Sequence, residues 1–171
     1  MTKLGCALLT LVTASILPLR NAAAQDTLGT QEYAVKFVCG QALADRPAVA
    51  RGRYYTAINI HNPNPETIVF LRKYAFTLPN EAPGPIARDS IPLKLGSDQA
   101  LELDCVRILR LAREFVRAPF AKGFAVIQTR VPLDVVAVYT AADSLGALEA
   151  MHMERVPARL IRVPFSVNKA P

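Results

Sequence analysis

The residues that could perform acid–base or nucleophilic chemistry are few in this chain. It contains only two histidines, His61 and His152, and a serine triad needs one of them as its base. None of the serines lies in a G-x-S-x-G motif, the turn that presents the nucleophile in many hydrolases. The turn at Asn62-Pro63 favours a strand-end position for His61 over a catalytic one. We therefore expect no serine hydrolase site.

The cysteines point to a structural role. Cys6 lies in an N-terminal segment that export would remove, which leaves Cys39 and Cys105. Two cysteines in an exported chain most simply form one disulfide, and this one would close a long loop worth roughly 4 kcal/mol in the chain-entropy model. The alternatives are two separate buried thiols, or a reactive thiolate at Cys105 at the start of a helix. We predict the disulfide because export places both residues in an oxidising compartment.

Met151-His152-Met153 offers the ligand types that suit copper. On a strand, however, the two methionines point to one face and the histidine to the other, so a site would need ligands from elsewhere. The sequence has no C-x-x-C pair and neither of the common glycine-rich nucleotide motifs. We expect no metal and no cofactor, and we keep a periplasmic copper-binding protein as an alternative. A glycosidase-type carboxylate pair has no sequence signature and stays open.

A row of arginines marks one side of a predicted helix. Asp104 can act as its N-cap, and the apolar residues of 105–117 gather on one side at helical spacing. The basic residues on the other side are Arg107, Arg110, Arg113 and Arg117. Such a face fits contact with an anionic envelope component or an acidic protein partner. We favour the alternative, a solvated helix face, because charge runs usually mark exposed surface.

The elements that must position these residues are mostly strands. Alternation of apolar and polar residues predicts strands over 32–39, 53–61, 67–77, 90–95, 99–103, 123–130, 134–141, 148–156 and 158–163. The turn at 62–66 predicts a hairpin between the second and third of them, and the proline-rich segment 78–88 predicts a surface loop. The segment 134–141 is apolar on both faces, which predicts a central strand.

These elements predict an all-β fold. Many short strands, 13 prolines and a single helix are typical of an antiparallel, immunoglobulin-like β-sandwich with one short amphipathic helix. The chain has no tryptophan, so the Cys–Trp–Cys hallmark of true immunoglobulin domains is missing, and a small barrel is the alternative fold. With 51% hydrophobic and 20% charged residues, the composition is that of a globular protein.

The first 24 residues have the order of a secretory signal peptide. Lys3 precedes an apolar run over 4–19, and Ala22-Ala23-Ala24 fits the small-residue cleavage site. The run is shorter than the roughly 20 residues that a spanning helix needs. We expect cleavage near Ala24, export to the periplasm or the cell exterior, and a single domain over 25–171. The first 24 residues contain two of the six net positive charges. The positive net charge of the remaining chain is too small to indicate nucleic-acid binding.

Several short segments carry a resemblance. They are Phe37-Val38-Cys39-Gly40, 54–63, 100–105, 122–124, 133–141 and Arg155-Val156-Pro157. In this order they resemble a set of small exported bacterial proteins of unassigned function. The resemblance implies export and a β-rich domain, and it carries over no activity and no catalytic residue. We therefore expect an exported, non-enzymatic binding or structural module of unknown ligand, with a small exported enzyme or a copper-binding protein as the alternative.

The signal-peptide prediction has a direct test in the N-terminus of the exported protein. N-terminal sequencing of the protein from the exported fraction should give a sequence that starts near Gln25. A chain that retains Met1 would show that the apolar segment is an uncleaved anchor instead.

Overall fold

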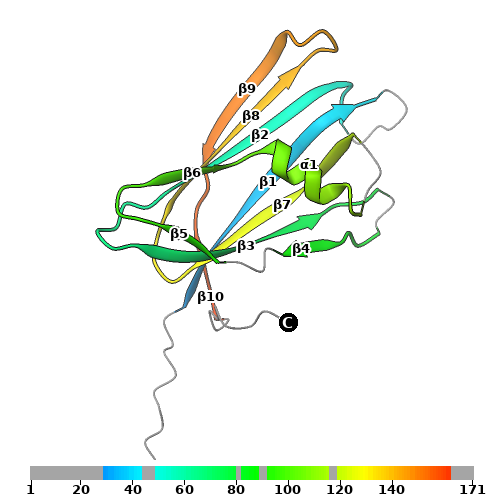
Figure 1. The fold of residues 1–171 in the computed structure, drawn as a ribbon. Helices are drawn as coiled ribbons and strands as arrows, with labels where there is room; N and C mark the ends of the chain where they lie inside the picture. Colours follow the sequence, from blue (N-terminus) through cyan, green and yellow to red (C-terminus); the bar gives the residue numbers. More distant parts are fainter. Residues whose placement is uncertain (1–28, 44–48, 80–81, 89–91, 116–118, 163–171) are drawn as a thin grey trace, which may run out of the picture.

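The computed structural model describes residues 29–43, 49–79, 82–88, 92–115 and 119–162 (Figure 1). The strands in this part are β1 (Thr30–Ala42), β2 (Gly52–His61), β3 (Ile68–Phe76), β4 (Ile86–Arg88), β5 (Leu93–Leu95), β6 (Ala100–Leu103), β7 (Phe120–Thr129), β8 (Asp134–Ala142), β9 (Leu148–Arg155) and β10 (Arg159–Ile161). The described helix is α1 (Cys105–Ala112), and every strand pairing is antiparallel. The all-β prediction with one short amphipathic helix is confirmed.

The strands form two layers that remain joined to each other. One layer contains β3, β7 and β1 with β4 and β5 along its β3 edge, and the other contains β6, β2, β8 and β9. The layers are continuous where β1 pairs with β2, which gives a sandwich-like arrangement folded from one sheet (Figure 1). In the core between them, Phe37 of β1 packs edge-on against Tyr74 and Phe76 of β3. Ile58 and Ile60 of β2 are equally buried.

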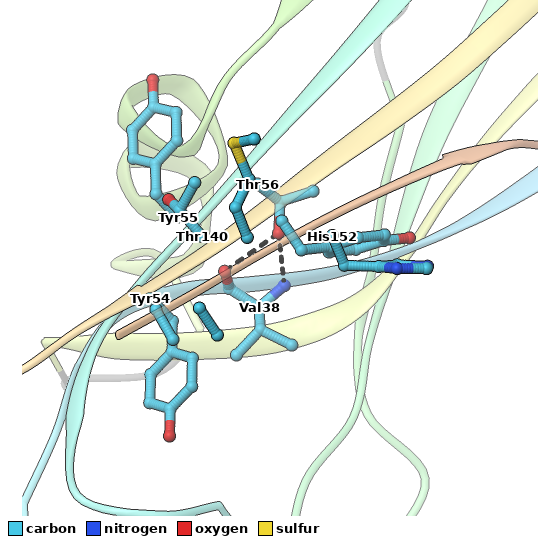
Figure 2. A pocket seen from close by; sticks show the side chains of 10 residues that line it. Val38, Tyr54, Tyr55, Thr56, Thr140 and His152 are labelled. Carbon is cyan, nitrogen blue, oxygen red and sulfur yellow. Dashed lines mark hydrogen bonds between the residues drawn. The ribbon is translucent and has the colours of Figure 1, made fainter. Parts of the chain in front are cut away.

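β1 and β2 are neighbours only at one end. They pair over residues 40–42 and 52–54 and then diverge, β1 beside β7 and β2 beside β6 and β8. Just past the last pair, the buried hydroxyl of Thr56 donates to the carbonyl oxygen of Val38 and accepts from its N–H, both at 3.0 Å (Figure 2). Backbone groups that lose their partner at the divergence therefore stay hydrogen-bonded.

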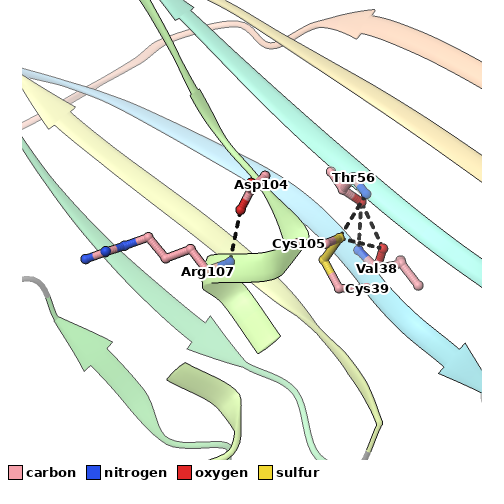
Figure 3. Close-up of a disulfide and its surroundings, with 6 residues drawn as sticks. All are labelled: Val38, Cys39, Thr56, Asp104, Cys105 and Arg107. Atoms are coloured by element: carbon pink, nitrogen blue, oxygen red, sulfur yellow. Dashed lines mark hydrogen bonds between the residues drawn. A yellow bond between two sulfur atoms is a disulfide. The ribbon is translucent and has the colours of Figure 1, made fainter. Parts of the chain in front are cut away.

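The disulfide lies at the point where β1 and β2 diverge, which we call the junction. Cys39 of β1 and Cys105 of α1 are bonded, with Cα atoms 5.3 Å apart, which confirms the predicted pair. The N–H of Thr56 is 3.0 Å from the Sγ atom of Cys105 (Figure 3). The sulfur thus faces the N–H of β2 that β1 no longer reaches, and the covalent bond ties the helix to the diverging strand.

Gly40 bends β1 at the junction. Its φ of 98° lies in the left-handed region that favours glycine, and a Cβ atom would lie 2.0 Å from the carbonyl oxygen of Pro119. The burial pattern shifts by one residue here, since Cys39 and Ala42 are buried while Gly40 and Gln41 are not. Gly40 lies opposite Tyr54 of β2, in the last pair before the two strands diverge.

α1 covers the end of the core next to this junction. The side chain of Asp104 accepts a hydrogen bond from the N–H of Arg107 at 2.9 Å, so the predicted N-cap is confirmed. The buried face of α1 contacts β1, β7 and β2. The helix ends at Ala112, short of the expected 105–117, because the N–H groups of Glu114 and Phe115 bond three residues back and tighten the last turn. No helix in the described ranges has the length and hydropathy to span a bilayer.

The predicted hairpin between β2 and β3 is wrong. β3 pairs with β7, β4 and β5, so the turn at 62–66 crosses from one layer to the other. The buried side chain of Asn62 holds this crossing by donating to the carbonyl oxygens of Glu66 and Gly96 at 2.8 and 2.9 Å. Its own carbonyl oxygen accepts from the N–H of Asn64 at 3.0 Å. The 78–88 segment also differs from a plain loop, because its last three residues form β4.

The Thr56 hydroxyl should contribute measurably to stability. Thr56→Val keeps the shape of the side chain but leaves the N–H and carbonyl of Val38 unpaired, which should lower the free energy of unfolding by roughly 1–3 kcal/mol in urea denaturation. Thr56→Ser keeps the hydroxyl and is the matched control. Equal losses in both variants would contradict the bridging role.

Candidate binding surface

The β8–β9 hairpin extends beyond the core. β8 lies between β2 and β9, which confirms the prediction that it is a central strand, whereas β9 is the end of the sheet. All eight residues of β9 are exposed, including three apolar side chains that are about two-thirds accessible. These side chains are Leu148 (64%), Met151 (68%) and Met153 (66%). An edge strand of this kind is a surface on which another chain can pair.

A groove lies between this hairpin and the edge of β1. Thr56, Tyr139 and His152 lie opposite one another on β2, β8 and β9 and therefore share one face of the sheet. Toward Ile58 and Ala137 that face is buried in the core. On the other side of the junction it opens into a hollow of about 210 Å³ (Figure 2). The lining includes Val38, Tyr54, Thr56, Tyr139, Ala141, Ala150 and His152.

Tyr139 and His152 line the groove and form a cluster with Glu154. The rings of Tyr139 and His152 are stacked, with centroids 6.1 Å apart and planes 20° apart. The hydroxyl of Tyr139 donates to the carboxylate of Glu154 at 2.8 Å. Burial and this carboxylate raise the pKa of Tyr139, so the hydroxyl remains protonated and acts as a donor. The cluster offers flat ring surface beside the Glu154 carboxylate, which suits contact with a ligand better than proton transfer.

A second hollow of about 360 Å³ lies against α1, β1, β2 and β8, and it shares Tyr54, Tyr55 and Thr140 with the groove. Val106 and Leu109 of α1 contribute to its lining. Tyr55 and Val106 are exposed apolar side chains here, at 40% and 59%. Concave surface is therefore present on both sides of the 54–55 segment of β2.

The candidate copper ligands lie on β9, and the described residues of the predicted basic face lie on α1 and its C-cap. Met151 and Met153 alternate with His152 along β9, so the two thioethers face away from the imidazole. Among the described residues, no group of three His, Cys, Asp or Glu side chains is placed to hold a metal ion. On α1 and its C-cap, Arg110 and Arg113 are exposed and Arg107 is half-buried. Arg117 lies outside the described residues.

His61 belongs to an ion-pair cluster that sequence reasoning missed. It is the last residue of β2, as expected, with Nε2 3.0 Å from Asp98 and Nδ1 3.4 Å from Asp134. Asp134 also pairs with Arg155 of β9 at 2.5 Å. Hydrogen bonds to Asp98 and then Asp134 raise the pKa of His61. Its partners are distant in sequence, so no local signal could have revealed the cluster, which links β2, β8, β9 and the turn before β6.

Comparison with known proteins gives little further information. No protein-family model matches the chain, and no curated protein matches it. A solved structure from Thermotoga maritima, described as "Crystal Structure of Thermotoga maritima 1070", is similar at 9% sequence identity with a TM-score of 0.45. The match covers 77% of this chain and 95% of that one. A likeness at this level carries no argument about the present chain.

The His61 cluster should make stability depend on pH. Because the folded protein raises the pKa of His61 above its ordinary 6.5, the stabilisation is fully present below that value and is lost as pH rises through the folded pKa. In urea denaturation at about pH 6, the parent should have a higher midpoint than His61→Gln, and the gap should narrow by about pH 8.5. A gap that is the same at both pH values would show that the imidazolium is not involved.

Proposed function

We propose that this protein is an exported, non-enzymatic binding module that binds a polypeptide partner through the β8–β9 hairpin. The observation that carries the proposal is that every residue of β9 is exposed, in an eight-residue edge strand with accessible Leu148, Met151 and Met153. An exposed edge strand with accessible apolar side chains is a surface on which another chain can pair, and the charged residues Glu149, Glu154 and Arg155 of the same strand would restrict which chain pairs there.

The size of the groove favours a polypeptide over a small molecule. The groove beside the hairpin holds about 210 Å³, less than the roughly 300–1,000 Å³ of common small-molecule sites, whereas the adjoining hollow against α1, at about 360 Å³, falls within that range. The volume of the groove suits one protruding side chain of a partner. The stacked rings of Tyr139 and His152 would form one wall for it, and the Thr56–Val38 contact the base.

The disposition of the reactive groups supports binding rather than catalysis. Cys39 and Cys105 are joined in a buried disulfide, so neither supplies a thiolate. His61 is held by Asp98 and Asp134, and His152 stacks on Tyr139. Each histidine therefore has a structural contact that explains its position.

The disulfide also supports export. Disulfides persist in the periplasm and outside the cell, where the predicted signal peptide would direct the chain. The proposed location of the module is therefore the envelope or the exterior, after cleavage near Ala24.

The proposal can be tested by photo-crosslinking in cells that export the chain. A photoreactive residue at Met151 should give a discrete adduct with a protein after irradiation, because this side chain projects from the free edge. The same residue at Val106, an exposed apolar position on α1, is the matched control and should give less of that adduct. Absence of any protein adduct from Met151 would contradict a polypeptide partner on this hairpin.

A further inference from the structure

We propose that the partner is a second copy of this chain, paired antiparallel through β9 about a twofold axis that passes through His152. This inference rests on the proposed function, since it names the occupant of the same edge. The pairing would join the β6–β2–β8–β9 layers of two molecules into one continuous sheet. Two properties of β9 lead to this register.

The first property is the direction of the backbone groups. The N–H of Val156 donates to the carbonyl oxygen of Val135 at 2.8 Å, just beyond the last pair of β8 with β9. In an antiparallel ladder, alternate residues bond to the same neighbour, so Glu154 and His152 also direct their backbones toward β8. The backbones of Met151, Met153 and Arg155 then face the free edge. A second strand can bond only in registers that place these residues opposite one another.

The second property is the match of side chains in the register centred on His152. Met151 then lies opposite Met153 of the second copy, and Arg155 lies opposite Glu149, each contact occurring twice by symmetry. On the other face, Ala150 lies opposite Glu154, and the two His152 side chains meet at the axis. The two exposed methionines of each copy therefore pair with each other across the axis.

The neighbouring registers match less well. In the register centred on Met151, Arg155 lies beyond the end of the second copy's strand and Glu149 lies opposite Met153. A centre at Met153 sets Met151 against Arg155, so an apolar side chain faces a charge. The irregular pairing between Ala141 and Ala142 places Glu149 at a bulge, which bounds the regular part of the edge at Ala150. Within this regular part, the register centred on His152 pairs residues 150–154 of one copy with the same residues of the other, and Arg155 lies opposite the bulge.

The edge is free to accept the second copy in the described structure. β9 pairs with β8 alone among the described strands, and the methionines of its outer face are about two-thirds exposed. The core reaches only as far as Ala137 and Val156, so pairing at β9 needs no rearrangement of buried side chains. The pairing would cover Met151 and Met153, the two side chains that leave the edge hydrophobic.

Cysteine cross-linking of the purified, disulfide-intact protein tests the register. Across the axis, the two residues at position 152 form a non-hydrogen-bonded pair with Cα atoms about 4.5 Å apart, within the range that a disulfide spans. His152→Cys should therefore form a covalent dimer under mild oxidation, seen at twice the mass on a non-reducing gel. Ser144→Cys, on the exposed turn of the same hairpin, is the control for random collision and should remain largely monomeric.

A second pair of variants avoids dependence on one substitution. Met151→Cys and Met153→Cys should each stay largely monomeric alone and should cross-link when mixed, because each lies opposite the other. A monomeric His152→Cys together with an unreactive mixture would overturn the self-pairing. Met151→Cys that cross-links with itself as readily as His152→Cys would overturn the register. If the photo-adduct at Met151 forms with a different protein, the binding surface is retained, and only the identification of the partner as a second copy of this chain is wrong. If no adduct forms, the binding surface itself is wrong.

Discussion

The divergence of β1 from β2 is the constraint on which the rest of this structure depends. Two strands that part inside a protein leave backbone donors and acceptors without partners, and such groups are costly when buried. Here the Thr56 hydroxyl serves both polar groups of Val38, and the Cys105 sulfur faces the N–H of Thr56. The disulfide to Cys39 holds the helix and the strand at this point. With these groups satisfied, the sheet can fold over on itself and close around one core.

The same divergence creates the surface that we assign to binding. One face of β2 and β8 is buried with Ile58 and Ala137, and beyond the junction it continues into the open with Tyr139 and His152 of the hairpin. A tightly closed barrel would have covered that extension. Among the described strands, β9 forms the end of this layer, with a free backbone edge and exposed methionines. The groove therefore depends on the divergence, and the edge depends on the position of β9 at the end of the strand order.

Sequence patterns and the expected compartment predicted part of this structure. Alternation identified β1 with its buried side chains, Asp104 identified the helix start, and the compartment argument identified the disulfide. The turn at 62–66 was misassigned because its prolines suit a hairpin, whereas the crossing depends on contacts of Asn62 with residues about 34 positions away. The groove could not be predicted, since Thr56 differs from its buried neighbours only by a hydroxyl whose partner lies 18 residues earlier. That single polar residue on an apolar face was the available signal.

Amide hydrogen exchange at Val38 tests the account most directly. Val38 and Lys36 both belong to the stretch of β1 that has β7 on one side and no described strand on the other. The alternation of the ladder directs both N–H groups to that open side, and only the N–H of Val38 meets the Thr56 hydroxyl. We predict that Val38 exchanges slowly, close to the rate set by global unfolding, whereas Lys36 exchanges fast. Equally fast exchange at both positions would contradict the claim that Thr56 secures the junction.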